Sequence, residues 1–259
     1  MKKRTFLSGC AAAAVLSAIS APSLAASQKT LLVAMDAAYP PFGSQDLKTK
    51  EYVGYDCDII RAIAAEEGFA VKIKNLQFDG LIPALRAGNI DIAINDITIT
   101  KERARSVDFS RRYYIAGLGV VVRKGNTSIR TAKDLEGKRL GVSIGSTGEE
   151  AARKILRAKV RVFNQLNEAY LELRNGGVDA VVNDIPTNDY YVATAGRGAV
   201  KALPVALTEE DLGIAVKKGN RTLLARINDG LEKVKKNGEF SRIYRKWFGK
   251  EPPKKLLAD

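Results

Sequence analysis

A phrase of thirteen residues that occurs twice constrains the fold of this chain more than any other feature. Residues 85–97 read LRAGNIDIAINDI and residues 173–185 read LRNGGVDAVVNDI, with identical residues at seven positions. Each copy leads from the end of a helix through a glycine turn into a short apolar strand that stops at Asn-Asp. The same strand in both halves predicts two similar α/β lobes.

Short apolar strands alternate with amphipathic helices along the chain, which is typical of mostly parallel sheets flanked by helices. The expected strands are 30–35, 69–75, 90–95, 114–122, 139–144, 159–163, 179–183 and 212–216. The expected helices are 56–67, 80–88, 101–107, 149–157, 167–175, 186–195, one that begins near Thr222 and one that ends near Phe248. The pattern therefore predicts an α/β fold.

The first 25 residues are expected to be a signal peptide that is removed on export. They open with Lys2, Lys3 and Arg4, continue with an alanine-rich apolar run, and end with small residues before a cleavage site near Ala25. The apolar run is too short to cross a bilayer. We therefore expect an exported protein of the periplasm.

The composition of the remaining residues excludes several classes of function. They contain no histidine and only one cysteine, Cys57, so we expect no internal disulfide, no zinc site, no cofactor and no histidine-based catalysis. Residues 1–25 hold three of the 42 basic residues and none of the 29 acidic ones, so the net charge changes from +13 to +10. Export argues against nucleic acid as a partner, and the charge indicates a solvated surface.

Ligands of open parallel sheets bind beyond the carboxyl ends of the strands. The residues at these ends are Asp36, the segments 95–98 and 145–147, and Asn183-Asp184. A single Asp there is usually a turn or helix-capping residue, but an acid at three strand ends favours a ligand site. The loop 145–148 has glycines around two hydroxyl residues and opens a helix, where N–H groups suit a carboxylate.

Several motifs, taken in order, make the chain similar to a known family. They are Tyr39-Pro-Pro-Phe42, Gly54-Tyr-Asp-Cys-Asp58, Phe78-Asp-Gly-Leu-Ile-Pro-Ala-Leu85, Asp96-Ile-Thr-Ile-Thr-Lys-Glu-Arg103, Val107-Asp-Phe-Ser110, Gly145-Ser-Thr147 and Tyr244-Arg-Lys-Trp-Phe-Gly249. With them the chain resembles the periplasmic polar-amino-acid-binding proteins of ABC importers, solute-binding protein family 3. The glutamine-binding and histidine- or lysine/arginine-binding members are the most similar.

The resemblance implies a two-lobed periplasmic-binding-protein fold of type II that closes on its ligand by a hinge motion. The first lobe would comprise residues 26–113 and 211–259, and the second about 118–207. The two crossings would lie near residues 114–117 and 208–211. The protein would be a monomer that hands an L-amino acid to an inner-membrane ABC permease.

The resemblance also assigns the groups that hold the amino-acid backbone. Arg103 matches the arginine on the ligand α-carboxylate, where a planar fork makes two charge-assisted hydrogen bonds. Ser146 and Thr147 match the loop whose N–H groups complete that carboxylate site. Thr98 matches a hydroxyl at the α-ammonium and an N–H at the carboxylate. Asp184 matches the acid that reaches the α-ammonium from the second lobe.

The ligand side chain would lie between two aromatic rings. Tyr39 and Phe78 match this pair, although most aromatic residues belong to the core, and Tyr39 beside its Pro-Pro turn is harder to bury there. Asp36 matches a residue near the polar end of the ligand side chain. Asp96 departs from the family, whose members usually have a small residue at this position. Its carboxylate either turns outward and caps the segment leading to Thr98 or faces the cleft.

The ligand class depends on these charges. If Asp96 faces the cleft, Asp36, Asp96 and Asp184 oppose only Arg103, and desolvated carboxylates without partners cost several kcal/mol each. This balance favours a basic amino acid such as arginine, lysine, ornithine or histidine, whose cation would sit between the rings and reach Asp36. Glutamine and cystine are the alternatives within the family. Residues 168–173 resemble the glutamine binders, whereas Ser143 stands where those proteins tend to have a lysine.

Two other classes of function remain as alternatives. A few proteins of this fold are similar to cyclohexadienyl dehydratases, for which Glu168 or Asp184 would be the candidate general acid. The amino-acid clamp of Arg103, Thr98 and Asp184 favours binding without catalysis. A sensory module is the third class, which is not favoured because we expect no fused membrane or signalling segment.

Overall fold

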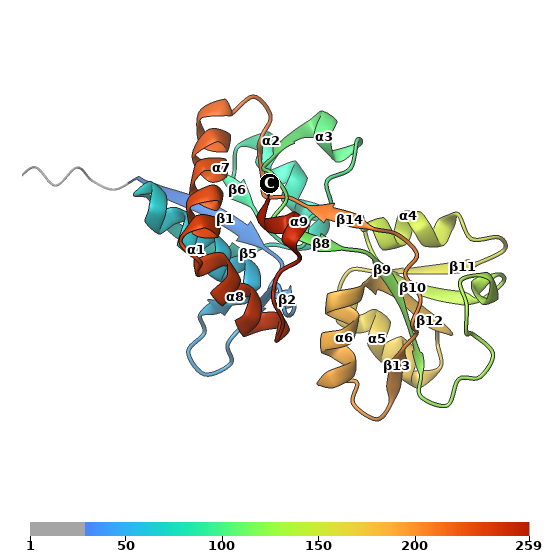
Figure 1. Cartoon of the computed structure of the whole chain (residues 1–259). Helices are drawn as coiled ribbons and strands as arrows, with labels where there is room; N and C mark the ends of the chain where they lie inside the picture. The colour runs from blue at the N-terminus through green and yellow to red at the C-terminus, as the bar shows by residue number, and fades with distance from the viewer. Residues whose placement is uncertain (1–28, 259) are drawn as a thin grey trace, which may run out of the picture.

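The computed structural model describes residues 29–258, which form two lobes joined by two extended crossings (Figure 1). The expected signal peptide and its cleavage near Ala25 lie outside the described residues. Within residues 29–258, no helix combines the length and the apolar composition that crossing a bilayer requires.

The first lobe contains a five-stranded sheet in the order β5-β1-β6-β15-β7. Its strands are β1 (Thr30–Met35), β5 (Ala70–Asn75), β6 (Ile92–Ala93), β7 (Val107–Phe109) and β15 (Ala215–Lys217). β1 runs parallel to β5 and β6, whereas β15 runs antiparallel to β6 and β7. The helices of the lobe are α1 (Tyr55–Glu67), α2 (Leu81–Ala87), α3 (Arg103–Ser106), α7 (Arg221–Lys236) and α8 (Glu239–Phe248).

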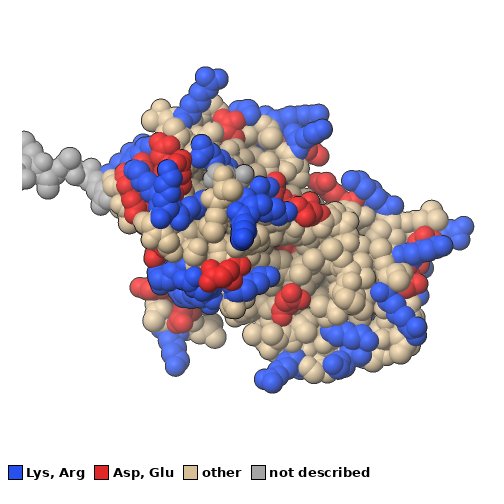
Figure 2. Space-filling view, viewed as in Figure 1, with Lys and Arg blue, Asp and Glu red and all other residues tan. Residues whose placement is uncertain are grey.

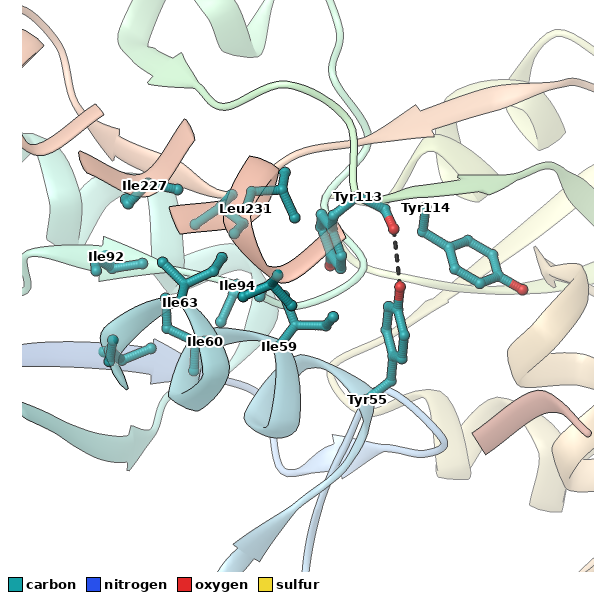
Figure 3. Packing of buried hydrophobic residues seen from close by; sticks show 14 of the residues in the cluster. Tyr55, Ile59, Ile60, Ile63, Ile92, Ile94, Tyr113, Tyr114, Ile227 and Leu231 are labelled. Atoms are coloured by element: carbon teal, nitrogen blue, oxygen red, sulfur yellow. Dashed lines mark hydrogen bonds between the residues drawn. The ribbon is translucent and has the colours of Figure 1, made fainter. Parts of the chain in front are cut away.

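The main core of the first lobe lies between the sheet and α1, α7 and α8 (Figure 3). Ile59, Ile60 and Ile63 of α1 are fully buried and pack with Ile227 and Leu231 of α7 in the same cluster. Their spacing places them on one face of α1. Burying each isoleucine contributes about 1.5–3 kcal/mol, so this face holds α1 against the sheet.

The second lobe repeats this arrangement with the order β11-β10-β12-β9-β13. Its strands are β9 (Leu118–Arg123), β10 (Arg139–Ser143), β11 (Lys159–Phe163), β12 (Ala180–Asp184) and β13 (Val200–Ala202), and its helices are α4 (Thr147–Arg153), α5 (Leu166–Asn175) and α6 (Ile185–Ala193). β6 and β12, which carry the repeated phrase, each lie between a parallel and an antiparallel strand. The predicted α/β fold class is confirmed, and the repeat marks equivalent strands.

The expected strand 114–122 is wrong, because the chain changes sheets at Gly117. β8 (Tyr114–Ala116) precedes this glycine and pairs antiparallel with β14 (Glu210–Leu212), whereas β9 belongs to the second lobe. A Cβ atom at Gly117 would lie 2.3 Å from the carbonyl oxygen of Thr208, so the two crossings touch at a point that only glycine allows. The expected strand 212–216 likewise divides, into β14 and β15.

Smaller elements complete the fold. β2 (Ala38–Tyr39), β3 (Gly43–Gln45) and β4 (Tyr52–Val53) form a small antiparallel sheet, and α9 (Lys254–Leu257) follows α8. A short 3₁₀ helix, η1 (Phe78–Gly80), leads into α2. Lys and Arg side chains project from both lobes (Figure 2), and many form surface ion pairs such as Arg139–Asp179, at 2.6 Å. Exposed pairs of this kind contribute little to stability.

Candidate functional site

Residues at the strand ends of both sheets meet between the lobes. Asp36 follows β1, Asp96 follows β6 and Asp184 ends β12. All three are buried, with 3–4% of each residue exposed. Side-chain hydrogen bonds cross from the first lobe or the crossing to the second lobe, among them Tyr39 to Asn183, Thr187 to Asp96, Arg103 to Gly145, and Thr147 to Glu210. The lobes are therefore in contact across the site.

Arg103, at the start of α3, reaches across this contact. Its Nη1 donates to the carbonyl oxygen of Thr98 and its Nη2 donates to the carbonyl oxygen of Gly145, both at 3.0 Å. The guanidinium carbon lies 5.3 Å from the ring centroid of Phe78. Arg103 thus lies beside the loop of Ser146 and Thr147. Backbone carbonyls take two of its five N–H donors and leave the others for an anionic group.

Ser146 caps helix α4, and Thr147 begins it. The Ser146 Oγ accepts a hydrogen bond from the N–H of Glu149 at 3.1 Å and donates to the carbonyl oxygen of Ser143 at 2.7 Å. The side chain of Ser146 is therefore occupied as a cap. Two cavities between the lobes flank α4, one of about 640 Å³ that Thr147 lines and one of about 730 Å³ that Arg103 and Ser146 line.

Tyr39 and Phe78 form the expected aromatic pair. Their ring centroids lie 6.3 Å apart with an interplanar angle of 19°. The Tyr39 hydroxyl donates to Asn183 Oδ1 at 2.5 Å and lies 3.4 Å from Asp184 Oδ2. Tyr39 is only 5% exposed and packs with second-lobe residues such as Tyr170, so it is buried, but by the other lobe.

Asp96 faces the second lobe, and the alternative in which it turns outward as a cap is wrong. The residue has a left-handed φ of 52°, and its N–H donates to Asp56 Oδ2 at 3.0 Å. Its own Oδ2 accepts from Thr187 Oγ1 at 3.5 Å. The neighbouring Asn95 holds the end of β1, because its Oδ1 accepts from the N–H of Asp36 at 2.7 Å. Aspartate tolerates a left-handed backbone conformation, such as that of Asp96, better than most residues.

Glu210, which the sequence did not predict as a site residue, lies in the returning crossing and is 8% exposed. Its Oε2 accepts from Thr98 Oγ1 at 2.6 Å and from Thr147 Oγ1 at 2.9 Å. Its Oε1 accepts from Thr208 Oγ1 at 2.9 Å. Glu210 is not at the carboxyl end of a parallel strand, so the rule that ligands bind beyond these ends did not predict it. The sequence signal that could have identified Glu210 as a site residue is an acid within a predicted crossing.

The site collects negative charge at one end. Burial and the charge of Glu210 raise the pKa of Asp184 to about 7, although Arg103 and the Tyr39 hydroxyl act in the opposite direction. Burial, Asp184 and Asp56 raise the pKa of Asp96 well above its usual range. Asp36 lies apart from this group: burial and the charge of Asp79 raise its pKa, whereas backbone hydrogen bonds from Ala38 and Phe78 lower it.

Both copies of the repeated Asn-Asp pair carry buried polar atoms without hydrogen-bond partners within residues 29–258. These atoms are Asn95 Nδ2, Asp96 Oδ1, Asn183 Nδ2 and Asp184 Oδ1. Leaving such atoms unpaired is costly, and more so when the group is charged. A ligand with a cationic hydrogen-bond donor would satisfy the two carboxylates.

The buried acids predict how stability depends on pH in the absence of ligand. Burial raises the pKa of Asp56 to about 8, from 3.8. A folded-state pKa above the unfolded value means that the folded protein holds the extra proton, so stability is lost as pH rises between these values, by at most about 1.4 kcal/mol per pH unit for each such group. Urea unfolding at several pH values should show this decline between pH 5 and pH 8 and a smaller one for Asp56→Asn. Equal slopes would contradict the role of Asp56.

A family model described as "Bacterial extracellular solute-binding proteins, family 3" matches residues 31–250. The chain belongs to this family. An L-arginine-binding protein of Pseudomonas aeruginosa is 37% identical to this solute-binding protein over 260 residues, which cover 96% of this chain and 97% of the relative. The L-cystine-binding protein TcyJ of Escherichia coli K12 is 34% identical over 228 residues, which cover 87% of this chain and 85% of the relative.

Solved structures agree with the fold. An ancestral arginine-binding protein bound to arginine has 45% identity and a TM-score of 0.82 to this solute-binding protein, covering 86% of this chain and 99% of that one. The predicted two-lobed fold of type II is confirmed. The ancestral amino acid-binding protein AncCDT-1, a precursor of cyclohexadienyl dehydratase, has 40% identity and a TM-score of 0.78, covering 85% of this chain and 95% of that one. The curated relatives are named as binding proteins.

Proposed function

We propose that this solute-binding protein captures a basic L-amino acid in the periplasm by closing its lobes and delivers it to an inner-membrane ABC permease. The observation that carries the proposal is the charge balance between the lobes. The acids Asp96, Asp184 and Glu210 are buried close to one another, with Arg103 as the cation beside Asp184 and Glu210, and Asp36 is buried apart from them at the end of β1. A zwitterion alone would leave this group under-neutralised, whereas a ligand with a second cation offsets more of the desolvation cost.

In this proposal the ligand backbone lies at the crowded acidic end. Arg103 and the N–H groups of Ser146 and Thr147 bind the α-carboxylate. Asp184, with Asp96 beside it, and Thr98 bind the α-ammonium. This assignment gives the unpaired carboxylate oxygens of both Asn-Asp pairs a donor.

The ligand side chain would then run between Tyr39 and Phe78 toward Asp36. Carbon atoms in contact lie about 3.5–4.0 Å apart, so a planar group between two rings needs centroids about 7 Å or more apart. The observed 6.3 Å is slightly smaller, and the rings would separate by about 1 Å to admit a guanidinium. The lobes would open and close about the crossings near residues 114–117 and 208–211, with residues 26–113 and 211–259 moving against 118–207.

Binding without catalysis is the second part of the proposal. Glu168, one candidate acid for a dehydratase, is exposed, and its carboxylate accepts from the N–H of Gln165 at 3.3 Å as part of a capping box at the start of α5. It therefore caps a helix outside the site. Asp184, the other candidate, already has a role at the ligand ammonium in the proposal. Turnover of prephenate or arogenate by the purified protein would contradict this part.

A melting-temperature panel of the twenty amino acids, ornithine and cystine tests the proposed ligand class. A micromolar ligand at 1 mM stabilises the folded state by about 4 kcal/mol, which corresponds to a rise of roughly 8–16 °C for a chain of this size. We expect this rise with at least one of arginine, lysine, ornithine and histidine, and smaller rises with glutamine and cystine. A large rise with glutamate alone would contradict the charge balance.

A further inference from the structure

Glu210 occupies a position that no other group of the proposed site shares, because it lies in the crossing between the lobes. It belongs to β14, which pairs with β8, the other crossing. Its Oε2 bonds to Thr98, in the first lobe, and to Thr147, at the start of α4 in the second. Its Oε1 bonds to Thr208 of the same crossing. One carboxylate thus joins three segments of the chain.

The direction of these hydrogen bonds determines what Thr98 and Thr147 offer to a ligand. An ionised carboxylate only accepts hydrogen bonds, so the Thr98 and Thr147 hydroxyls each donate their single hydrogen to Glu210. The hydroxyl oxygens then retain only lone pairs for other partners. An ammonium only donates hydrogen bonds, so it can bind to these hydroxyl lone pairs. An ionised carboxylate only accepts hydrogen bonds and cannot bind to them.

The bond between Glu210 and Thr147 also depends on lobe position. Thr98 is bridged to β14 through Leu212, so it stays near Glu210 when the lobes move. Thr147 belongs to the second lobe, and its 2.9 Å bond to Glu210 requires the lobes to be close. A substitution of Glu210 therefore changes both the polarity of the hydroxyls and an interaction of the closed form.

We propose that Glu210 is a positioning residue that orients the Thr98 and Thr147 hydroxyls as acceptors for the ligand α-ammonium and couples this recognition to lobe closure. The inference rests on the proposed function and deepens it by naming a residue that selects the ammonium group. Glu210 itself acts through the two threonines and does not touch the ligand.

A comparison of two ligands with two proteins tests this role. The ligands are L-arginine and 5-guanidinopentanoate, which is arginine without its α-ammonium. The proteins are the wild type and Glu210→Gln, whose amide replaces one acceptor by a donor of nearly the same shape. An amino acid that stabilises the wild type more than L-arginine in the panel would replace it, together with its own deaminated acid.

We expect Glu210→Gln to weaken L-arginine binding about 10- to 100-fold, as the loss of a hydrogen bond to a charged group does. We expect the affinity for 5-guanidinopentanoate to change by no more than about threefold, because that ligand lacks the ammonium and the amide oxygen of the glutamine can still accept from the Thr147 hydroxyl in the closed form. Calorimetric titration measures both. Equal losses for the two ligands, or no loss for L-arginine, would overturn the role of Glu210.

Two further variants make the test robust. Glu209→Gln is the matched control, because Glu209 lies in the same crossing but is exposed and pairs with Lys255 at 2.7 Å; we expect an affinity within about twofold of the wild type. If Glu210→Gln does not fold, Thr147→Val removes one of the two hydroxyls, and it should again weaken L-arginine more than 5-guanidinopentanoate. A wild type that binds no amino acid would overturn the proposed function as well.

Discussion

Replacing Arg103 by alanine is expected to weaken the binding of every α-amino acid by about a hundredfold to a thousandfold, because truncation of one partner of a buried charge pair leaves the other unpaired. Arg103 is 9% exposed and is held by the carbonyl oxygens of Thr98 and Gly145, so it is already oriented between the lobes. Calorimetric titration with the amino acid that the melting panel selects measures the loss.

Arg105→Ala is the matched control for this substitution. Arg105 lies on the same short helix, α3, and its side chain is exposed, so its removal should leave the affinity within about twofold. Arg103→Lys should restore little, because lysine lacks the planar fork that pairs with a carboxylate. Affinity within about threefold of the wild type in Arg103→Ala would refute the proposed carboxylate clamp.

The second large effect is a loss of affinity in acid. The pKa of Asp184 is raised to about 7 by burial and by Glu210, and the pKa of the neighbouring Asp96 is also raised. The ligand ammonium needs an ionised carboxylate, whereas a proton occupies Asp184 below about pH 7. The apparent affinity is therefore expected to fall by about tenfold for each pH unit below that point, and to be constant above it.

Titrations between pH 5 and pH 8 measure this dependence. In Glu210→Gln the negative charge that raises the pKa of Asp184 is lost, so the pKa of Asp184 falls and the decline in affinity should begin at a lower pH. Asp229→Ser, an equal change of charge at an exposed position of α7, should leave the profile unchanged. An affinity independent of pH in the wild type would contradict the proposed proton competition.

Local sequence patterns predicted much of the fold. The repeated phrase predicted equivalent strands, and β6 and β12 hold equivalent places in their sheets. The spacing of the isoleucines in α1 predicted a buried face, because helix geometry alone places residues with this spacing on one side. The division of the expected strand 114–122 could not be predicted from the sequence, because it results from the contact of Gly117 with Thr208, which is far away along the chain.

The candidate site was predicted less completely. Residues at strand ends, such as Asp36, Asp96 and Asp184, follow from the rule for parallel sheets, and Arg103 follows from the resemblance to the family. The direction of Asp96 depends on its bond to Asp56, 40 residues earlier, and on the left-handed conformation of its backbone. Glu210 contributes through hydroxyls that are 63 and 112 residues away in the sequence.

The sequence by itself thus determined two α/β lobes, the family and the acids at the strand ends, because these depend on periodicity and on motifs within short segments. Only the tertiary structure decided which carboxylates share one buried space and which donors each one meets. The physical reason is that burial and charge interactions depend on distances between segments, and local patterns do not contain those distances. Asp184 of the second Asn-Asp pair interacts with Asp96 of the first only because the fold brings the two lobes together.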